Sequence, residues 1–421
     1  MICSSVCGHD WGASVLAGPG RRSGPETCTC APVTVSKNMT VEQTLRDLVA
    51  IDSVSARSNA EVIEYLEARC HEAGLKTRRF PHTDENGMAK INLVARTSAG
   101  ERAGSSQTSV GDTELALVGH TDTVPYASNW HEALQLTAAD GKLFGRGSCD
   151  TKAFIAAALT AVATVDLTQL QKPLALVFTA DEEIGCLGAG RLAQAKPFTA
   201  RYAIVGEPTS LRPMRAGKGY CLAEITVRGR EAHSAYPQLG ASAIFRAARL
   251  IERIEHVAQQ LQRERHPGFD PPFTTLNVGL IKGGSAKNVV AGECGFTLEW
   301  RTIPGQPAAY TLDLIRQELE RLQGDDPDFV CEIEATRADN SFEVPARSKI
   351  VQFLERASGN SAGTVAFGTE APSMIALGAE AVVLGPGDIR VAHRTGEFVP
   401  VNELNRCVEI LSGAIRHFCA G

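Results

Sequence analysis

The chain has 421 residues, of which 43% are hydrophobic and 21% are charged, close to the averages of folded globular proteins. Its 42 lysines and arginines against 48 aspartates and glutamates give a net charge of -6, without the basic excess that binding to a phosphate backbone needs. Composition therefore excludes a disordered chain and argues against a nucleic-acid partner. At roughly 100–200 residues per domain, the length predicts two or three domains.

The chain shows no sign of membrane insertion or export. No apolar run reaches the roughly 20 residues of a membrane span, and the first 30 residues hold no continuous hydrophobic stretch of the signal-peptide kind. We therefore expect a cytoplasmic protein with no membrane partner. Of the 12 cysteines, eight are scattered among apolar neighbours, which is typical of reduced core thiols.

The other four cysteines lie within residues 1–38, a segment rich in Gly, Ser, Cys and Pro without periodicity. We interpret this segment as a poorly ordered extension, because it has little apolar surface to bury. Its Cys3-x3-Cys7 and Cys28-x-Cys30 spacings match a zinc knuckle poorly, and no histidine pair follows them.

Removing residues 1–38, so that the chain starts at Met39, should leave turnover and the thermal midpoint nearly unchanged. The physical reason is the missing apolar periodicity of the removed segment. The measurement is steady-state kinetics and a thermal melt of both chains. A large loss of either quantity would show that the four early cysteines have a role.

From residue 41 the pattern alternates between helices and strands. Helices are predicted at 41–51, 58–74 and 152–165, and strands at 76–80, 90–95, 115–118, 174–179 and 202–205. The later strands are unbroken apolar runs, which are typical of a mostly parallel sheet with helices on both faces. Helices at 348–358 and 401–418 and a strand at 381–384 continue this α/β pattern at the end of the chain.

Between these two parts the strands alternate with a period of two. Strands are predicted at 222–228, 275–282, 294–301 and 330–336, with helices at 241–262 and 312–322. This order is that of a ferredoxin-like α+β domain. We therefore predict an α/β domain in two parts, 39–212 and 339–421, interrupted by an inserted satellite domain at 213–338.

Acids and histidines follow several of the predicted α/β strands. Taken alone, each group has a plainer reading: His120 and Asp122 as a hydrogen-bonded loop pair, Asp150 as a helix N-cap, and Asp181-Glu182-Glu183 as solvated turn acids. Glu207 and His393 repeat the pattern, and the carboxyl ends of strands in an open α/β sheet point to one crevice. Two histidines with several carboxylates suit Zn²⁺, Mn²⁺ or Co²⁺, and two ions fit the number of carboxylates better than one.

Seven motifs together resemble the acetylornithine deacetylase and succinyl-diaminopimelate desuccinylase family of dinuclear zinc amidohydrolases, with the acetylornithine deacetylase branch favoured. In chain order they are GHTDTVP (119–125), GRGSCDTK (145–152), TADEEIGCLGA (179–189), VGEPTS (205–210), REAHSAYP (230–237), FGTEAPS (367–373) and VLGPGDIRVAH (383–393). The resemblance implies two Zn²⁺, or Co²⁺ or Mn²⁺, bridged by Asp150, with His120 and Glu207 on one ion and Glu183 and His393 on the other.

The same resemblance implies the remaining roles. Glu182 is the expected general base, and Asp122 the expected hydrogen-bond partner that orients His120. Asn288 and Arg301 match positions that hold the substrate's α-carboxylate, although a salt bridge at the end of a strand is an alternative for Arg301. His233 is expected to act in the site of a second subunit across a homodimer interface, with a loop histidine that caps a turn as the alternative. The resemblance thus makes 39–212 and 339–421 the catalytic domain and 213–338 the dimerisation or lid domain. The resemblance also implies a cis peptide bond at Asp150-Thr151, and it leaves Glu370 without an assigned role.

The implied activity is hydrolysis of N2-acetyl-L-ornithine, a small-molecule N-acyl amino acid, to ornithine and acetate in arginine biosynthesis. Alternatives within the class are a succinyl-diaminopimelate desuccinylase or another N-acyl-amino-acid amidohydrolase. A non-catalytic, peptide-binding member with structural metals is the alternative from another class.

Overall fold

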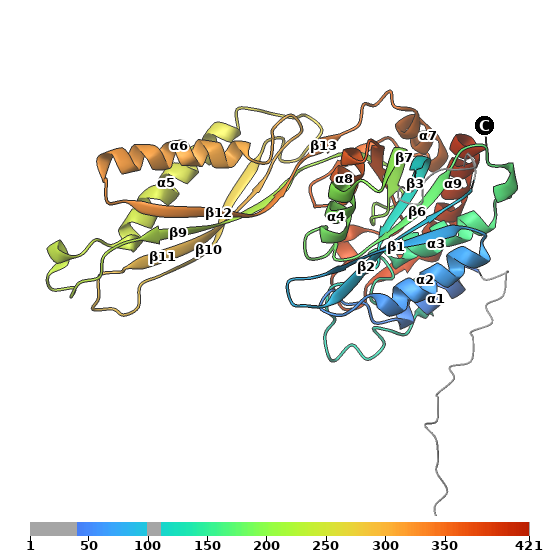
Figure 1. Cartoon of the computed structure of the whole chain (residues 1–421), viewed down its shortest axis with the longest axis horizontal. Helices are drawn as coiled ribbons and strands as arrows, with labels where there is room; N and C mark the ends of the chain where they lie inside the picture. Colours follow the sequence, from blue (N-terminus) through green and yellow to red (C-terminus); the bar gives the residue numbers. More distant parts are fainter. Residues whose placement is uncertain (1–39, 99–110, 421) are drawn as a thin grey trace, which may run out of the picture. The chain divides into compact units, whose positions relative to one another are not determined.

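The computed structural model describes residues 40–98 and 111–420. The predicted extension at 1–38 lies outside the described residues. Figure 1 shows two groups of strands, each with helices packed against it. One is a nine-stranded sheet with the order β1-β2-β6-β3-β7-β15-β8-β13, in which β14 also pairs with β8. Its strands are β1 (Lys76–Thr83), β2 (Ala89–Arg96), β3 (Gly111–His120), β6 (Leu174–Thr179), β7 (Phe198–Val205), β8 (Met214–Gly217), β13 (Phe342–Glu343), β14 (Gly363–Val365) and β15 (Glu380–Val383).

The centre of this sheet is parallel and its edges are antiparallel. Strands β6, β3, β7 and β15 run parallel, whereas β1, β2, β8 and β13 join mainly through antiparallel pairs. The predicted parallel α/β sheet is therefore confirmed at its centre. The short strands β8, β13 and β14 carry too few residues to show a pattern in the sequence. Strand β8 belongs to the large sheet, although the predicted domain boundary at 213 precedes it.

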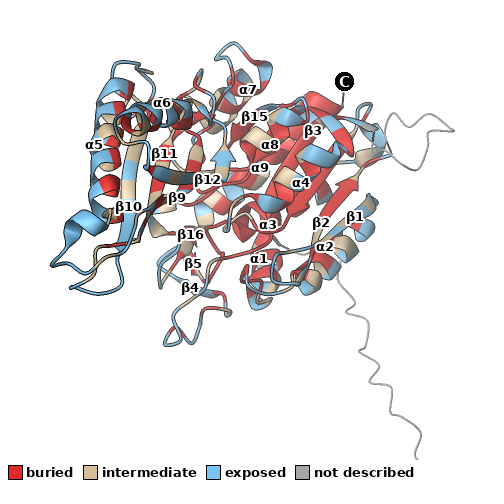
Figure 2. Cartoon of the chain, turned by 60° about the vertical axis from the view of Figure 1, so that its left-hand side comes forward, coloured by how far each residue is buried: buried red, intermediate tan, exposed pale blue. Residues whose placement is uncertain are grey.

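Helices cover both faces of the large sheet because alternate side chains of each strand point to opposite faces. On β3, Leu115 and Leu117 pack on one face, whereas Ala116 and Val118 pack on the other. The first face is covered by α1 (Val41–Ala50), α2 (Ala60–Glu72), α3 (Lys152–Ala163), α7 (Lys349–Ser358) and α9 (Val401–Cys419), and the second by α4 (Leu187–Ala195) and α8 (Ala371–Ala376). Figure 2 shows the central strands almost entirely buried between these layers.

The remaining elements of the large α/β part form a small sheet of three strands. It has the order β16-β5-β4, with β4 (Thr137–Ala139), β5 (Lys142–Phe144) and β16 (Phe398–Pro400). This sheet joins the segment before Asp150 to the segment after His393, because β16 pairs with β5. The sequence pattern does not predict it.

The second large group of strands is an antiparallel sheet with the order β10-β11-β9-β12. Its elements follow in the order β9 (Tyr220–Arg228), α5 (Ala243–Leu261), β10 (Thr275–Gly283), β11 (Glu293–Arg301), α6 (Tyr310–Asp325) and β12 (Val330–Asp339). The order and pairing are those of a ferredoxin-like unit. Its apolar core includes Ile225, Leu250, Leu298 and Ile315, and it is separate from the cores of the large sheet. The domain boundaries themselves stay predictions.

Most cysteines are buried, as predicted. The eight cysteines among the described residues are free thiols, and all of them except Cys331 are buried.

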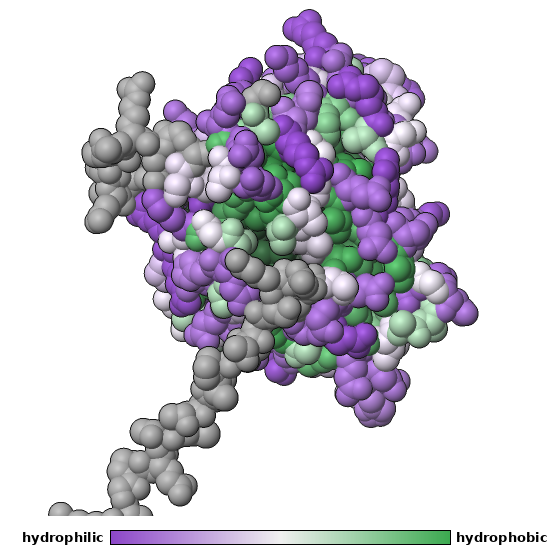
Figure 3. Space-filling model, turned by 90° about the vertical axis from the view of Figure 1, so that its right-hand side faces the viewer, coloured by the Kyte–Doolittle hydropathy of each residue, from purple (hydrophilic) through white to green (hydrophobic). Residues whose placement is uncertain are grey.

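None of the helices in the described ranges is both long and apolar enough to cross a membrane. On the face shown in Figure 3, hydrophilic side chains lie around the outline and hydrophobic ones gather nearer the middle.

Candidate metal centre and active site

Three of the predicted ligands form a compact cluster at the carboxyl ends of the central strands. His120 is the last residue of β3, Asp150 lies two residues before α3, and Glu183 follows β6. One ligand atom from each of these residues lies within 4.8 Å of the others. His120 Nε2 is 3.1 Å from Asp150 Oδ1. The structure therefore brings together residues that are up to 63 positions apart in the sequence, between His120 and Glu183.

His393 completes this cluster from the far end of the chain. Its Nε2 lies 3.1 Å from Asp150 Oδ2 and 2.9 Å from Glu183 Oε2. Its side chain is 49% exposed, whereas His120 and Asp150 are buried, so the cluster meets solvent on the His393 side. Asp150 thus contacts both imidazoles, as expected of the residue predicted to bridge two ions.

Glu207 reaches the same region from the end of β7. Its carboxyl group is buried, and its charge interacts with those of Asp150, Glu182 and His120. The close approach of β7 and α3 requires Gly206, since a Cβ there would lie 2.2 Å from the ring of Phe154. Thr151 Oγ1 donates to Gly206 O at 3.0 Å, which links the Asp150 segment to the Glu207 segment. The Asp150-Thr151 peptide bond is cis, as the resemblance implied.

The protonation of the cluster shows how strongly it attracts positive charge. Hydrogen bonds to Asp150 and Glu183 raise the pKa of His393 to about 10. Burial raises the pKa of Glu207 well above its usual range, and the charge of Asp150 adds to this shift. Burial alone would raise the pKa of Asp150, but its contacts with His120 and His393 lower it. Carboxylates crowded in a buried place require a positive partner.

A divalent metal ion fits this set of residues. The set consists of two imidazoles and three carboxylates, which are ligands that zinc, cobalt and manganese accept. The buried atoms Glu183 Oε1 and Glu207 Oε1 have no hydrogen-bond partner among the described residues. Both oxygens are therefore available to coordinate a cation.

Glu182, the predicted base, is held in place by the segment that follows it. Cys186 Sγ donates to Glu182 Oε1 at 3.1 Å. Burial raises the pKa of Glu182 to about 8, and the neighbouring carboxylates of Glu183 and Glu370 add to the shift. The preceding Asp181 has a left-handed backbone, with φ of 58°, and its buried side chain is anchored by Lys90 Nζ at 2.7 Å. The turn after β6 thus directs Glu182 and Glu183 into the cluster.

Asp122 makes different contacts from those expected. His120 Nδ1 lies 3.0 Å from the backbone oxygen of Asp122 but 3.7 Å from its carboxylate. The carbonyl, rather than the side chain, is therefore the nearer partner of the ring. The carboxylate accepts hydrogen bonds from the backbone N–H groups of Glu182 and Glu183, at 3.0 and 3.2 Å, and from Ser55 Oγ at 2.7 Å. It thereby fixes the turn that carries the predicted base.

Glu397 is a buried residue of this region to which the sequence analysis assigned no role. Its Oε1 accepts hydrogen bonds from the backbone N–H groups of Cys149 and Asp150, at 2.9 and 3.0 Å. Its Oε2 pairs with Arg146 at 2.6 Å, and both side chains are almost fully buried. Glu397 therefore holds the backbone beside the cis bond. Glu397 follows His393 by four residues, but nothing in the pattern shows that it reaches back to Asp150.

Replacing Glu397 with Gln should lower the free energy of unfolding by about 3–5 kcal/mol, because it leaves the buried guanidinium of Arg146 without its counter-charge. Chemical denaturation monitored by circular dichroism measures the change. Glu409→Gln is the matched control, since Glu409 pairs with Arg406 on an exposed surface. Its expected effect is below about 0.5 kcal/mol. Equal effects of the two variants would contradict a structural role for the buried pair.

Three predicted site residues lie in the ferredoxin-like unit and have no contact with the cluster. His233 is exposed, and its Nδ1 accepts a hydrogen bond from its own loop, at Ala235 N. Asn288 is also exposed and lies beside it, since Asn288 O accepts from Ser234 N at 3.0 Å. Arg301 Nε pairs with Glu299 at 2.7 Å, and its Nη1 donates to Ala366 O at 2.8 Å. The salt bridge considered as an alternative for Arg301 is therefore present.

A sheet with parallel central strands and a histidine and carboxylate cluster at their carboxyl ends defines a metallohydrolase of the zinc-peptidase type. Residues 116–417 match the model of the family described as Peptidase family M20/M25/M40. The chain belongs to this family, and it is a metal-dependent hydrolase that acts on amide bonds.

The chain is similar to relatives over almost its entire length. It is 53% identical over 382 residues to the acetylornithine deacetylase of Myxococcus xanthus, covering 90% of this chain and 97% of the relative. It is 34% identical over 383 residues to the acetylornithine deacetylase of Klebsiella pneumoniae (strain 342), covering 89% and 96%. Among solved structures, a tripeptidase from Staphylococcus aureus superposes with a TM-score of 0.70 at 22% identity, covering 90% and 97%. That likeness shows the fold.

Proposed function

We propose that this chain hydrolyses N2-acetyl-L-ornithine to L-ornithine and acetate, a step of arginine biosynthesis that takes place in the cytoplasm. The observation that carries the proposal is the 53% identity, over nearly the whole of both chains, with a relative of that activity. The cluster of His120, Asp150 and Glu183 supports it, because amide hydrolysis by this family depends on metal.

Two Zn²⁺ ions, for which Co²⁺ or Mn²⁺ can substitute, are the proposed cofactors. His120 and Glu207 would hold one ion and Glu183 and His393 the other, with Asp150 shared between them. When bound, such ions polarise the amide carbonyl and acidify a water molecule. Contacts of Asp150 with both histidines, at 3.1 Å each, support this division.

Glu182 is the proposed general base. Its carboxylate takes a proton from the attacking water and delivers it to the nitrogen of the departing amine, which requires a base that is not itself a metal ligand. Burial of this carboxylate raises its pKa and so makes it a stronger base. Asp122 keeps this base in position through the two backbone N–H groups described above.

Asn288 and Arg301 are the proposed partners of the substrate's α-carboxylate. The planar fork of an arginine fits a carboxylate. Arg301 donates a hydrogen bond to Ala366 O, which lies five residues before the start of α8. Its guanidinium therefore lies against the segment that leads into this helix.

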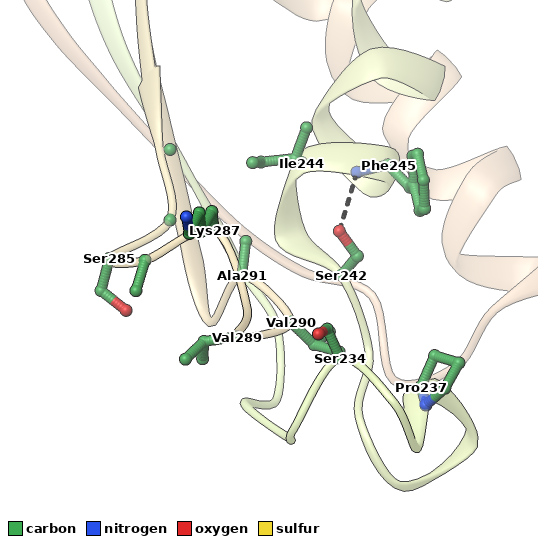
Figure 4. A pocket seen from close by; sticks show the side chains of 13 residues that line it. Ser234, Pro237, Ser242, Ile244, Phe245, Ser285, Lys287, Val289, Val290 and Ala291 are labelled. Carbon is green, nitrogen blue, oxygen red and sulfur yellow. Dashed lines mark hydrogen bonds between the residues drawn. The ribbon is translucent and has the colours of Figure 1, made fainter.

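We propose that the protein is a homodimer joined through the ferredoxin-like unit. The start of α5 and the facing loop form a cavity of about 700 Å³ in this unit (Figure 4). In Figure 4 Ile244 points from the helix toward the side of Val289, Val290 and Ala291, whereas Phe245 points away from them. Phe245 is 75% exposed, and Leu239, Leu280 and Ile281 are exposed in the same unit. A second copy of the chain would cover these apolar side chains.

His233 is the proposed donor that this homodimer brings to the other subunit's site. A hydrogen-bond donor aimed at the negative charge of the transition state is worth about 10²–10³ in turnover. Mixing an inactive His233→Ala chain with an inactive Glu182→Ala chain should therefore restore part of the activity, because some heterodimers hold one site with both groups intact. Activity of the mixture after subunit exchange is the measurement. Exchange without recovery would contradict the role in trans.

The experiment that tests the proposed function is a comparison of turnover on four substrates by metal-reconstituted protein. The panel consists of N2-acetylornithine, acetylcitrulline, acetylmethionine and succinyl-diaminopimelate. We expect the highest kcat/KM on N2-acetylornithine. No turnover of that compound would contradict the proposal, and preference for the succinyl compound would favour a desuccinylase.

A further inference from the structure

Glu370 is a buried carboxylate that has no part in the catalytic scheme above. It is the residue before α8, and it is 1% exposed. Neither of its carboxylate oxygens accepts a hydrogen bond of normal geometry among the described residues, and the neighbouring donor, the hydroxyl of Thr179, carries no charge. Its side chain does not cap the helix that it precedes. Burying a carboxylate without a partner is costly, so a positive group is expected to meet it at some stage of the reaction.

The other buried carboxylates of this region already have protein partners. Asp122 accepts from Ser55 and from two backbone N–H groups, Asp181 pairs with Lys90, and Glu397 pairs with Arg146. Asp150 and Glu183 lie beside His393 as proposed metal ligands. Glu182 accepts a hydrogen bond from the thiol of Cys186. Among the described residues of the site, Glu370 is thus the carboxylate that remains for a cation.

Glu370 lies near the cluster, and its neighbours in the chain line a cavity. Its charge interacts with those of His120 and Asp122 and with that of Glu182. Its chain neighbours Thr369, Pro372 and Ser373 line a cavity of about 410 Å³, and Cys186, which contacts the base, lines it too.

We propose that Glu370 binds the side-chain ammonium group of the substrate and thereby determines specificity for acylated diamino acids. This inference rests on the proposed function. In N2-acetylornithine the α-nitrogen is a neutral amide and the α-carboxyl group is negative, so the δ-ammonium is the one cation. That group, buried in a site rich in carboxylates, needs a carboxylate that neither metal nor protein donors occupy.

The test compares N2-acetyl-L-ornithine with N2-acetyl-L-norvaline, which has the same carbon chain but lacks the δ-nitrogen. Wild-type protein should prefer the ornithine compound, and Glu370→Gln should lower that preference in kcat/KM by about 10²-fold, mainly through KM. Turnover of the norvaline compound and the content of bound zinc should change little. Glu370→Asp, which keeps the charge, should retain a clear preference for the ornithine compound.

Two results would overturn the inference. An equal loss on both substrates in Glu370→Gln would show that the residue supports the site as a whole. Equal turnover of both compounds by wild-type protein would overturn it even if neither variant folded, and it would leave the amidohydrolase activity intact. By contrast, wild-type protein that cleaves only the norvaline compound would contradict the proposed function itself, and the assignment of Glu370 with it.

Discussion

Replacing Glu182 with Gln is expected to lower kcat by about 10²–10⁴-fold while the zinc content stays at the wild-type level. The glutamine keeps the size of the side chain and can still accept from Cys186, but it cannot carry a proton between the water and the leaving amine. Steady-state kinetics on N2-acetylornithine and elemental analysis of the same sample measure the two quantities.

This variant also separates an enzyme from a metal-containing protein that only binds peptides. A protein that only binds peptides does not need a free carboxylate beside the metal ligands. Its affinity for peptides would therefore not change in this variant. Glu409→Gln is the control, because Glu409 is exposed, pairs with Arg406, and has no assigned role in the site. Full activity in Glu182→Gln would exclude the assigned role.

Removal of metal is expected to abolish turnover, and Asp150→Asn is expected to do the same by preventing tight binding. Asp150 contacts both histidines, and a neutral amide in its place lacks the charge that two cations require. Zn²⁺ added to chelated wild-type protein should restore activity and raise the thermal midpoint, since a ligand of the folded state stabilises it. The Asp150→Asn variant should show neither response.

The thermal response makes this prediction independent of catalysis. Glu403→Gln serves as a control, because Glu403 accepts a hydrogen bond from Gly387 N, and no ligand role was assigned to it. Its response to Zn²⁺ should match that of the wild type. Active protein without any bound transition metal would refute the metal centre altogether.

The elements that carry the site, and the types of residue placed on them, could be predicted from periodicity and motifs. Unbroken apolar runs predicted β3, β6 and β7, and the structure has them at 111–120, 174–179 and 198–205. Because parallel strands end at one edge of the sheet, the groups that follow β3 and β6 were expected to meet. His120 and Glu183 do meet, together with Asp150 before α3 and His393 after β15. The family resemblance implied a cis peptide bond at Asp150-Thr151, and the structure has it. These features depend on local periodicity and on motifs, which a sequence contains directly.

The groups that hold the site in place could not be predicted from the sequence and became apparent only in the folded chain. Glu397 lies 247 positions from Asp150 in the chain, and its hydrogen bond to that backbone depends on the pairing of β16 with β5. The carboxylate of Asp122 binds the turn of Glu182 and Glu183 instead of the ring of His120, a difference of less than 1 Å between two acceptors. The sequence shows Glu370 only as an acid that precedes a helix. Its burial and its lack of a charged partner follow from the folded structure. Such contacts follow from how distant segments pack, and no local pattern of residue types records that packing.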